Sequence, residues 1–183
     1  MEKVTIFDLP MKRILITGPE STGKSELANE LGRHYGGIVV PEYAREFIQE
    51  LGRPYQFEDV EHIALRQMEE YDKSFHPQWI FFDTWLIITR VWFRIVYNRV
   101  PAWLDEKIRV ASFDLVLLCD TDIPWIADPV RENGGLKREE LLESYKYELN
   151  HFGMDWELVS GSGPTRLLHA RQLIDNKIAN GTT

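Results

Sequence analysis

Residues 13–27 read RILITGPESTGKSEL, and this stretch decides the fold. An apolar segment from Arg13 to Thr17 is followed by a turn that holds two glycines and a lysine, and then by the start of a helix. The turn from Gly18 to Ser25 matches the pattern G-x-x-x-x-G-K-[ST] at every fixed position. Strand, turn and helix in this order predict a loop that binds phosphate.

Each fixed position of this turn has a physical role in binding a nucleoside triphosphate. The glycines let the backbone turn so that consecutive N–H groups point inward, where the positive end of the helix adds attraction for anions. Lys24 can reach the β- and γ-phosphates, and the Ser25 hydroxyl can bind Mg²⁺. We therefore predict ATP and Mg²⁺ as ligands, against the alternative of a helix start with a solvated lysine. The residues predicted to bind ATP are Gly18, Glu20, Ser21, Thr22, Gly23, Lys24 and Ser25, and no role is predicted for the next residue, Glu26.

The rest of the chain alternates strand-like and helix-like segments, a rhythm that is typical of a parallel sheet covered by helices. The predicted strands are 13–17, 38–40, 79–82, 113–118 and 156–159, and the predicted helices are 23–35, 42–51, 57–75, 85–97, 104–110, 137–152 and 164–178. The expected fold is therefore a three-layer α/β P-loop NTPase fold with a five-stranded parallel sheet, as in nucleoside and nucleotide kinases. We expect residues 1–11 to be a loose extension, 12–183 a single domain, and 120–136 a lid.

Composition limits the classes of partner. A chain of 183 residues with 44% hydrophobic content can bury one core, and a formal net charge of -8 argues against a binder of nucleic acid or membrane surfaces. One cysteine, Cys119, allows no disulfide framework and fits a reducing cytoplasm. The apolar stretch 85–97 is shorter than the roughly 20 residues that span a bilayer. We expect a cytoplasmic protein with a small-molecule substrate, and its oligomeric state stays open.

An acidic residue that could hold Mg²⁺ follows the third predicted strand. The segment WIFFDT places Asp83 where the predicted third strand ends, which is the Walker B arrangement that holds Mg²⁺. The alternative is that Asp83 caps the helix starting at Trp85. Because Thr84 can serve as that cap, we predict the metal role for Asp83.

Glu42 and Arg45 lie just after the second predicted strand, at the carboxyl edge of the sheet where open α/β folds bind ligands. A carboxylate there could orient or deprotonate a hydroxyl acceptor, and the arginine could hold the acceptor. The alternative is an ion pair on a helix surface. We predict Glu42 as the catalytic base, with Asp83 as the second choice, and both Glu42 and Arg45 as substrate-binding residues.

The long polar loop 120–136 is the other candidate, because such loops inside compact domains are usually functional. A lid that folds down would bring arginine charge to the transferred phosphoryl group. We choose Arg131 as this catalytic arginine and Arg138 as the reserve, against the alternative of a solvated loop.

Trp85 is predicted to bind the substrate. It could stack on a flat base beside the carboxyl edge of the sheet, although aromatic residues in such a segment are more often part of a core.

Other classes of nucleotide-binding protein do not fit. A GTPase needs N-K-x-D, but Asn176 and Lys177 are followed by Ile-Ala, and neither the acidic pair of an AAA+ motor nor an ABC signature is present. What remains is a compact kinase for a nucleoside or nucleotide. An ATP-binding sensor without transferase activity stays open, as does a kinase for a nucleoside monophosphate, for which Arg45, Arg90 and Arg94 would supply charge.

Several stretches together resemble a known family: GPESTGKSELA, PEYAREF, FFDT and TDIPWIADPVRENGG followed by KREELLESYKYEL. They are similar to the ribosylnicotinamide kinase domain of NadR-type proteins, which belong to the AAA-domain-like P-loop kinases. The resemblance implies transfer of phosphate from ATP to nicotinamide riboside. It places Asp128 and Arg131 in the lid, Glu42 and Arg45 on the acceptor side, and Asp83 near the metal or the acceptor hydroxyl.

Two departures from the family stand out. The adenylyltransferase motif H-x-G-H and a helix-turn-helix are not found, so we expect the kinase part alone. The family's Walker B segment commonly continues Asp-Thr-Asp, whereas this sequence has Trp85 in the third position. The exact acceptor therefore stays open.

Overall fold

Five parallel strands form the central sheet of the computed structural model, which describes residues 10–73, 75, 77–127 and 134–180. They are β1 (Lys12–Thr17), β2 (Ile38–Val40), β3 (Trp79–Asp83), β4 (Leu115–Cys119) and β5 (Trp156–Val159). Their order across the sheet is β2-β3-β1-β4-β5, and every neighbouring pair is parallel. The predicted α/β fold with a five-stranded parallel sheet is confirmed.

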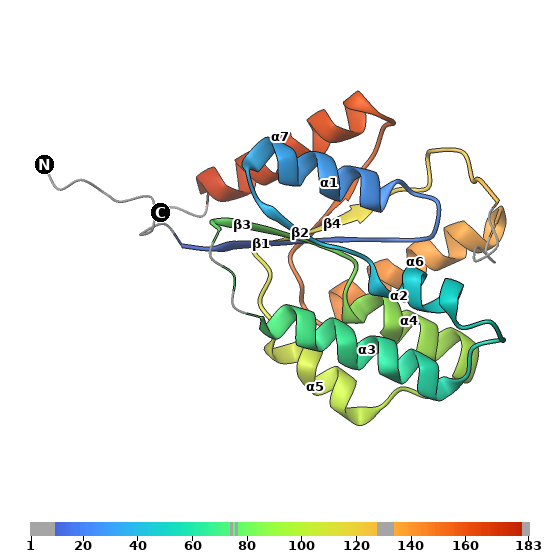
Figure 1. Cartoon of the computed structure of the whole chain (residues 1–183). Coiled ribbons are helices and arrows are strands. Elements are labelled where there is room, and N and C mark those ends of the chain that lie inside the picture. Colours follow the sequence, from blue (N-terminus) through green and yellow to red (C-terminus); the bar gives the residue numbers. More distant parts are fainter. Residues whose placement is uncertain (1–9, 74, 76, 128–133, 181–183) are drawn as a thin grey trace, which may run out of the picture.

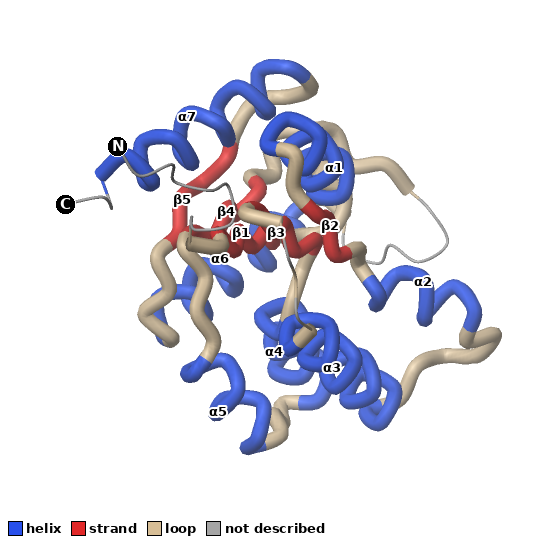
Figure 2. Tube along the Cα trace, turned by 60° about the vertical axis from the view of Figure 1, so that its left-hand side comes forward, coloured by secondary structure: helices blue, strands red, loops and turns tan. Residues whose placement is uncertain are grey.

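Helices cover both faces of this sheet and make the three predicted layers. The helices are α1 (Lys24–Tyr35), α2 (Tyr43–Glu50), α3 (Phe57–Asp72), α4 (Leu86–Tyr97), α5 (Ala102–Val110), α6 (Leu136–His151) and α7 (Pro164–Asn180). Helices α1 and α7 lie on one face, and α3, α4, α5 and α6 lie on the other (Figures 1 and 2). Among the described helices, none is long and apolar enough to cross a membrane.

The central strand β1 shows why the sequence specifies two helical layers. Ile14 and Ile16 pack in the core beneath α1 and α7, whereas Leu15 packs in the core beneath the other helices, and all three side chains are fully buried. Side chains alternate between the faces of a strand, so an unbroken apolar run needs cover on both sides. The apolar run that predicted a doubly buried strand therefore has a core on each face.

Parallel pairing brings the candidate residues to one edge of the sheet. Ile16 of β1 pairs with Asp83 of β3, so the end of β3 is level with the exit of β1 into the glycine-bearing turn. The loops after β1, β2, β3 and β4 gather at the same edge, on the right-hand side of Figure 1. This is the edge at which open α/β sheets bind ligands.

The predicted cap of α4 is wrong. Trp85 occupies the N-cap position and no side chain caps this helix. The Thr84 N–H instead donates to the Ile16 carbonyl at 2.9 Å, and Thr84 adopts a left-handed backbone with φ of 66°. The strand pairing thus continues one residue past β3, which leaves Thr84 outside the geometry of a cap. The other differences are small shifts of ends: β4 begins at Leu115, and α3 ends at Asp72.

The turn after β1 requires glycine at its first position. Gly18 has φ of 134°, and a Cβ there would lie 2.8 Å from the backbone oxygen of Cys119 in β4. Gly36, at the end of α1, has a positive φ of 65° but no neighbour within 4 Å of an added Cβ.

We expect Gly36→Ala to lower the free energy of unfolding by about 1 kcal/mol, because only the backbone is strained, and Gly18→Ala by about 3 kcal/mol, because the added Cβ also meets the Cys119 oxygen. Urea denaturation measures both, and equal losses would contradict the close approach.

Candidate active site

The turn between β1 and α1 is a tightly bent loop. Gly18, Ser21 and Gly23 all have positive φ, and Ser21 is the one among them that carries a side chain, with φ of 57°. The hydroxyl of Thr22 donates to the Pro19 carbonyl at 2.8 Å, which closes the bend. Such a bend turns consecutive N–H groups toward one point, where the N-terminus of α1 adds its partial positive charge.

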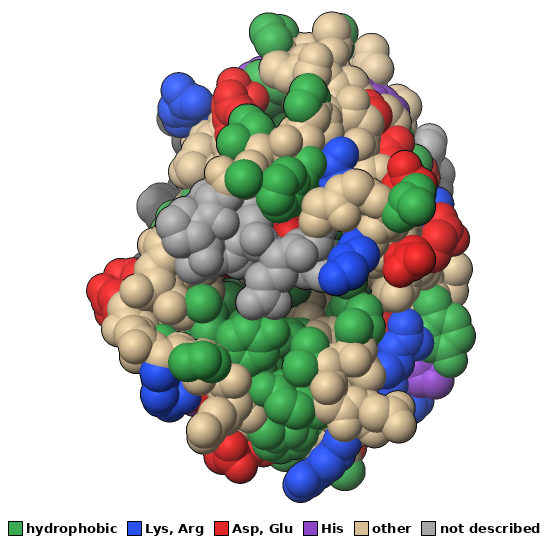
Figure 3. Space-filling model, turned by 90° about the vertical axis from the view of Figure 1, so that its right-hand side faces the viewer, with side chains coloured by type: hydrophobic (Ala, Val, Ile, Leu, Met, Phe, Trp, Pro, Cys, Tyr) green, Lys and Arg blue, Asp and Glu red, His purple; other side chains and the backbone are tan. Residues whose placement is uncertain are grey.

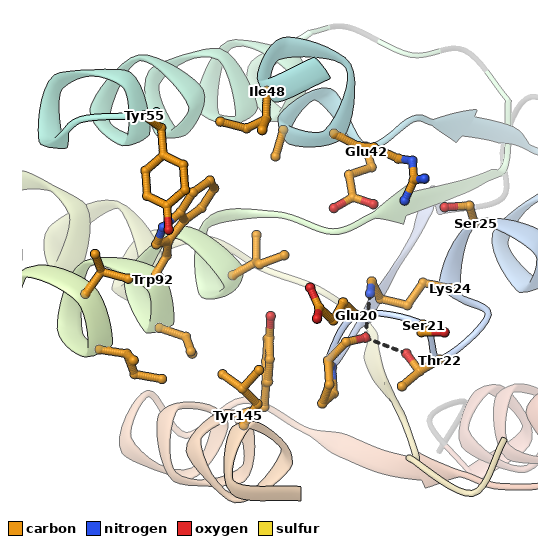
Figure 4. Close-up of a pocket in the computed structure, with 18 of the residues that line it drawn as sticks. Glu20, Ser21, Thr22, Lys24, Ser25, Glu42, Ile48, Tyr55, Trp92 and Tyr145 are labelled. Carbon is orange, nitrogen blue, oxygen red and sulfur yellow. Dashed lines mark hydrogen bonds between the residues drawn. The ribbon is translucent and has the colours of Figure 1, made fainter. Parts of the chain in front are cut away.

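Lys24 folds back across this loop. Its ammonium group donates to the Pro19 carbonyl at 2.8 Å, and the residue is only 7% exposed. Figure 4 shows the side chain directed into a cavity together with Glu20 and Glu42. A cation fixed beside inward-facing N–H groups is the arrangement that binds the β- and γ-phosphates of a nucleotide.

Asp83 and Ser25 fit a magnesium ion. Asp83 is 4% exposed, and its Oδ1 atom has no hydrogen-bond partner among the described residues. Burial raises the pKa of the Asp83 carboxyl above its usual range, and the nearby Ser25 hydroxyl and Lys24 ammonium partly offset this rise. Mg²⁺ prefers oxygen ligands and keeps several waters, so one carboxylate and one hydroxyl are a sufficient protein contribution.

A cavity of about 630 Å³ joins the loop to the residues predicted to bind the acceptor. Its walls include Lys24 and Ser25 at one side and Glu42 and Arg45 at the start of α2. Glu26, exposed in the first turn of α1, also lines the cavity, which therefore extends one residue past the predicted ATP-binding residues. Figure 4 places the Glu42 carboxylate opposite the Lys24 ammonium, across the cavity. The structure thus brings phosphate-side and acceptor-side residues to the same hollow, which could hold a triphosphate and an acceptor together.

The far end of the cavity is apolar and aromatic. Tyr55 and Trp92 line it with ring centroids 4.7 Å apart at an angle of 82°. The exposed side chains of Ile95 and Val96 also line it. Figure 3 shows hydrophobic side chains gathered beside a hollow on the face that lies to the right in Figure 1. A flat, largely apolar group would fit this end.

Tyr145 of α6 completes the wall between the two ends and was not predicted. Burial and, to a lesser extent, the carboxylates of Glu42 and Glu20 raise its pKa, so the phenol stays neutral and can donate a hydrogen bond. The spacing of Ile88, Trp92 and Ile95 along α4 could have indicated the aromatic end, because these residues share one helical face.

Trp85, which was predicted to bind the substrate, lies in the core and not at the cavity. It is 2% exposed and packs against Tyr71 and Phe113 in the core, with ring centroids 5.1 Å from each, and it does not line the large cavity. The expected stacking platform beside Asp83 is therefore corrected to a core residue, because the left-handed turn at Thr84 places the indole in the core beneath the sheet. Asp128 and Arg131 lie outside the described residues.

Arg138, the reserve arginine, is 9% exposed and is bound to main-chain oxygens. It donates to the carbonyls of Ser21, Thr121 and Ile123. Every one of these acceptors belongs to the phosphate loop or to the segment after β4, and Arg138 does not line the cavity. In this structure its guanidinium supports the loop.

Fold and site together define a P-loop protein with the architecture of nucleoside and nucleotide kinases. Residues 13–166 match the family model described as an AAA domain, and the chain belongs to that family. It is 29% identical over 130 residues to the trifunctional NAD biosynthesis/regulator protein NadR of Salmonella typhimurium. The aligned region covers 68% of this chain and 32% of that relative. The predicted resemblance to a NadR-type kinase domain is thereby confirmed, and the chain spans about a third of the length of that relative.

Solved structures show the same fold. NadR in complex with NR superimposes with a TM-score of 0.78 at 23% identity, over 91% of this chain and 50% of that one. NadR in complex with NAD and AMP-PNP gives 0.76, also at 23% identity and 91% coverage, over 49% of that chain. Deoxyadenosine kinase from M. mycoides gives 0.65 at 19% identity, over 92% and 99% of the two chains.

The burial of Asp83 predicts a stability cost that depends on pH. As pH rises from the carboxyl's ordinary pKa of 3.8, the unfolded chain loses this proton before the folded chain does, so ionisation weakens the folded state. We expect Asp83→Asn to stabilise the ligand-free protein at pH 7.5, with a gain that shrinks toward pH 4, while Mg²⁺-dependent ATP binding is lost. Urea denaturation at the two pH values checks this, and a gain independent of pH would contradict it.

Proposed function

We propose that the protein is an ATP- and Mg²⁺-dependent kinase that phosphorylates the 5′-hydroxyl of nicotinamide riboside to give nicotinamide mononucleotide. The observation that carries the proposal is the shared cavity: the phosphate loop, the Glu42 carboxylate and an aromatic recess line one hollow of about 630 Å³. Phosphoryl transfer depends on positioning and charge neutralisation, and a shared hollow is its first requirement. The NadR relatives support the choice of acceptor.

In this mechanism Glu42 accepts the proton of the 5′-hydroxyl while the hydroxyl oxygen bonds to the γ-phosphorus and the bond to the ADP oxygen breaks. Glu42 suits this role because it ends the segment after β2 and faces Lys24 across the cavity (Figure 4). Asp83, buried beside Ser25, would hold the metal. Arg45 would hold the acceptor, and Arg131 keeps its proposed role at the transferred group.

Charge on the moving phosphoryl group would be neutralised chiefly by Lys24 and the N-terminus of α1. Mg²⁺, if held by Ser25 and Asp83, would add positive charge that offsets the negative charge of the phosphates. Tyr145 can donate a hydrogen bond from its neutral phenol to a ribose oxygen or to a carboxylate in the cavity.

The aromatic recess favours nicotinamide riboside over neutral nucleosides. Its pyridinium ring carries a permanent positive charge, and cations are attracted to the faces of Trp and Tyr rings. Tyr55 and Trp92 offer such faces, and the acidic residues Glu20 and Glu42 line the same cavity. A ring that is both flat and cationic matches this combination.

A nucleoside monophosphate as acceptor loses two of the three arginines suggested for it. Arg90 pairs with Asp105 and Glu148, Arg94 pairs with Glu148, and neither arginine lines the cavity. Both belong to the contact between α4 and α6. Arg45 remains in the cavity wall, and Arg53, which also lines the cavity, forms an ion pair with Asp59. A monophosphate acceptor is therefore supported by only one of the three arginines suggested for it.

Acceptor-dependent formation of ADP tests the proposed function. We expect ADP and nicotinamide mononucleotide to form in equal amounts from MgATP and nicotinamide riboside, with kcat/KM at least about tenfold above that for reduced nicotinamide riboside, which lacks the ring charge. Adenosine, thymidine and nucleoside monophosphates complete the panel. ADP formation without acceptor dependence, or binding of ATP without turnover, would overturn the proposal and support an ATP sensor.

Glu42→Gln separates catalysis from nucleotide binding. We expect kcat to fall by about 100-fold or more because the amide cannot accept the proton, while the KM for ATP stays within about twofold. Glu46→Gln, on the exposed side of the same helix, is the matched control and should retain the wild-type kcat. Full activity of Glu42→Gln would remove Glu42 as the base and make Asp83 the candidate.

A further inference from the structure

Two buried arginines from distant parts of the chain contact the outside of the phosphate loop. Arg138 in the first turn of α6 donates to the Ser21 carbonyl at 3.2 Å, and Arg166 in the first turn of α7 donates to the Thr22 carbonyl at 2.9 Å. The two arginines are 9% and 4% exposed. Neither of them lines the cavity, so the site described above leaves their purpose open.

The two accepted oxygens belong to consecutive peptide units. The Ser21 carbonyl shares its peptide plane with the Thr22 N–H, and the Thr22 carbonyl shares its plane with the Gly23 N–H. In a planar trans peptide the oxygen and the hydrogen point in opposite directions. An arginine that holds the oxygen outward therefore holds the N–H inward, toward the place where the triphosphate binds.

Ser21 needs such support because its backbone is strained. A residue with a side chain at φ of 57° costs energy, and it persists only where the surroundings fix it. The Ser21 carbonyl is held by Arg138, and its hydroxyl accepts a hydrogen bond from the Ile126 N–H at 2.9 Å. The strained residue is thus fixed from two separate segments of the chain.

Both guanidinium groups are themselves anchored to the segment that follows β4. Arg138 donates to the Thr121 and Ile123 carbonyls at 2.7 Å each. Arg166 donates to the Asp120 carbonyl at 3.2 Å and forms an ion pair with Asp122. Its Nε also donates to the Gly161 carbonyl at 2.7 Å. Each planar guanidinium therefore joins the loop to a fixed part of the fold, which a single ammonium group on a flexible stem could not do equally well.

We propose that Arg138 and Arg166 are positioning residues that hold two consecutive peptide units of the phosphate loop with their N–H groups directed at the nucleotide phosphates. The inference rests on the nucleotide-binding part of the proposed function and not on the identity of the acceptor. Loss of either arginine frees a peptide unit to rotate, which weakens the grip on polyphosphate. The acceptor end of the cavity is formed by other residues and keeps its affinity.

Binding of Mg²⁺-tripolyphosphate by isothermal titration calorimetry tests this directly, because that ligand lacks a base, a sugar and an acceptor. We expect Arg138→Met and Arg166→Met each to raise the dissociation constant by about 10- to 100-fold. In the kinase assay, KM for ATP should rise by a similar factor, while KM for nicotinamide riboside changes less than about threefold. Arg138→Lys and Arg166→Lys keep the charge and should recover part of the affinity.

Arg90→Met is the matched control. Arg90 is 9% exposed, like Arg138, and is ion-paired, like Arg166, but its partners are Asp105 and Glu148 in the contact of α4 with α5 and α6. The Arg90→Met protein should lose thermal stability but bind tripolyphosphate as tightly as the wild type. Should a methionine variant be unfolded at the assay temperature, its lysine variant is measured in its place and should show a smaller loss of affinity in the same direction. Wild-type affinity in folded variants at both positions, or an equal loss in Arg90→Met, would overturn the inference, whereas a wild-type protein that binds no tripolyphosphate would overturn the proposed function itself.

Discussion

The direction of the backbone N–H groups between β1 and α1 is the constraint on which the site depends. These groups can converge on an anion only if the chain adopts positive φ at Gly18, Ser21 and Gly23, which costs conformational energy. The central position of β1 in the sheet, the close approach of Gly18 to Cys119 and the two buried arginines supply the support. Stability of the fold and affinity for phosphate are therefore linked through one short turn.

The second half of the site follows from the order of the strands. Because β3 lies between β1 and β2, Asp83 at the end of β3 lies beside Ser25 and Lys24 of the phosphate loop, and Glu42 after β2 lines the same cavity as that loop. Helix α4 directs some of its residues at the cavity and others at α6. Trp92 and its apolar neighbours line the cavity, whereas Arg90 and Arg94 bind the fully buried Glu148 of α6. The ion pairs join the two helices whose other residues form the cavity walls, so they hold the shape of the recess without entering it.

The sequence predicted the parts of the site that depend on local pattern. The phosphate loop follows β1, Glu42 lies just after β2 and Asp83 ends β3, and parallel strands bring their carboxyl ends to one edge of the sheet. Which aromatic side chain faces a cavity is a tertiary property, so Trp85 was expected there and Tyr55, Trp92 and Tyr145 were missed. The contacts of Arg138 and Arg166 with the loop join residues more than 100 positions apart, which no local pattern indicates.

A crystal structure with a non-hydrolysable ATP analogue, Mg²⁺ and nicotinamide riboside bound together tests the central claim most directly. The account predicts phosphates surrounded by the N–H groups of the loop and the Lys24 ammonium, with the metal beside Ser25 and Asp83. It also predicts the nicotinamide ring in the recess of Tyr55 and Trp92, and the 5′-hydroxyl between the Glu42 carboxylate and the γ-phosphate. A riboside bound outside the shared cavity, or a 5′-hydroxyl directed away from the γ-phosphate, would contradict the account.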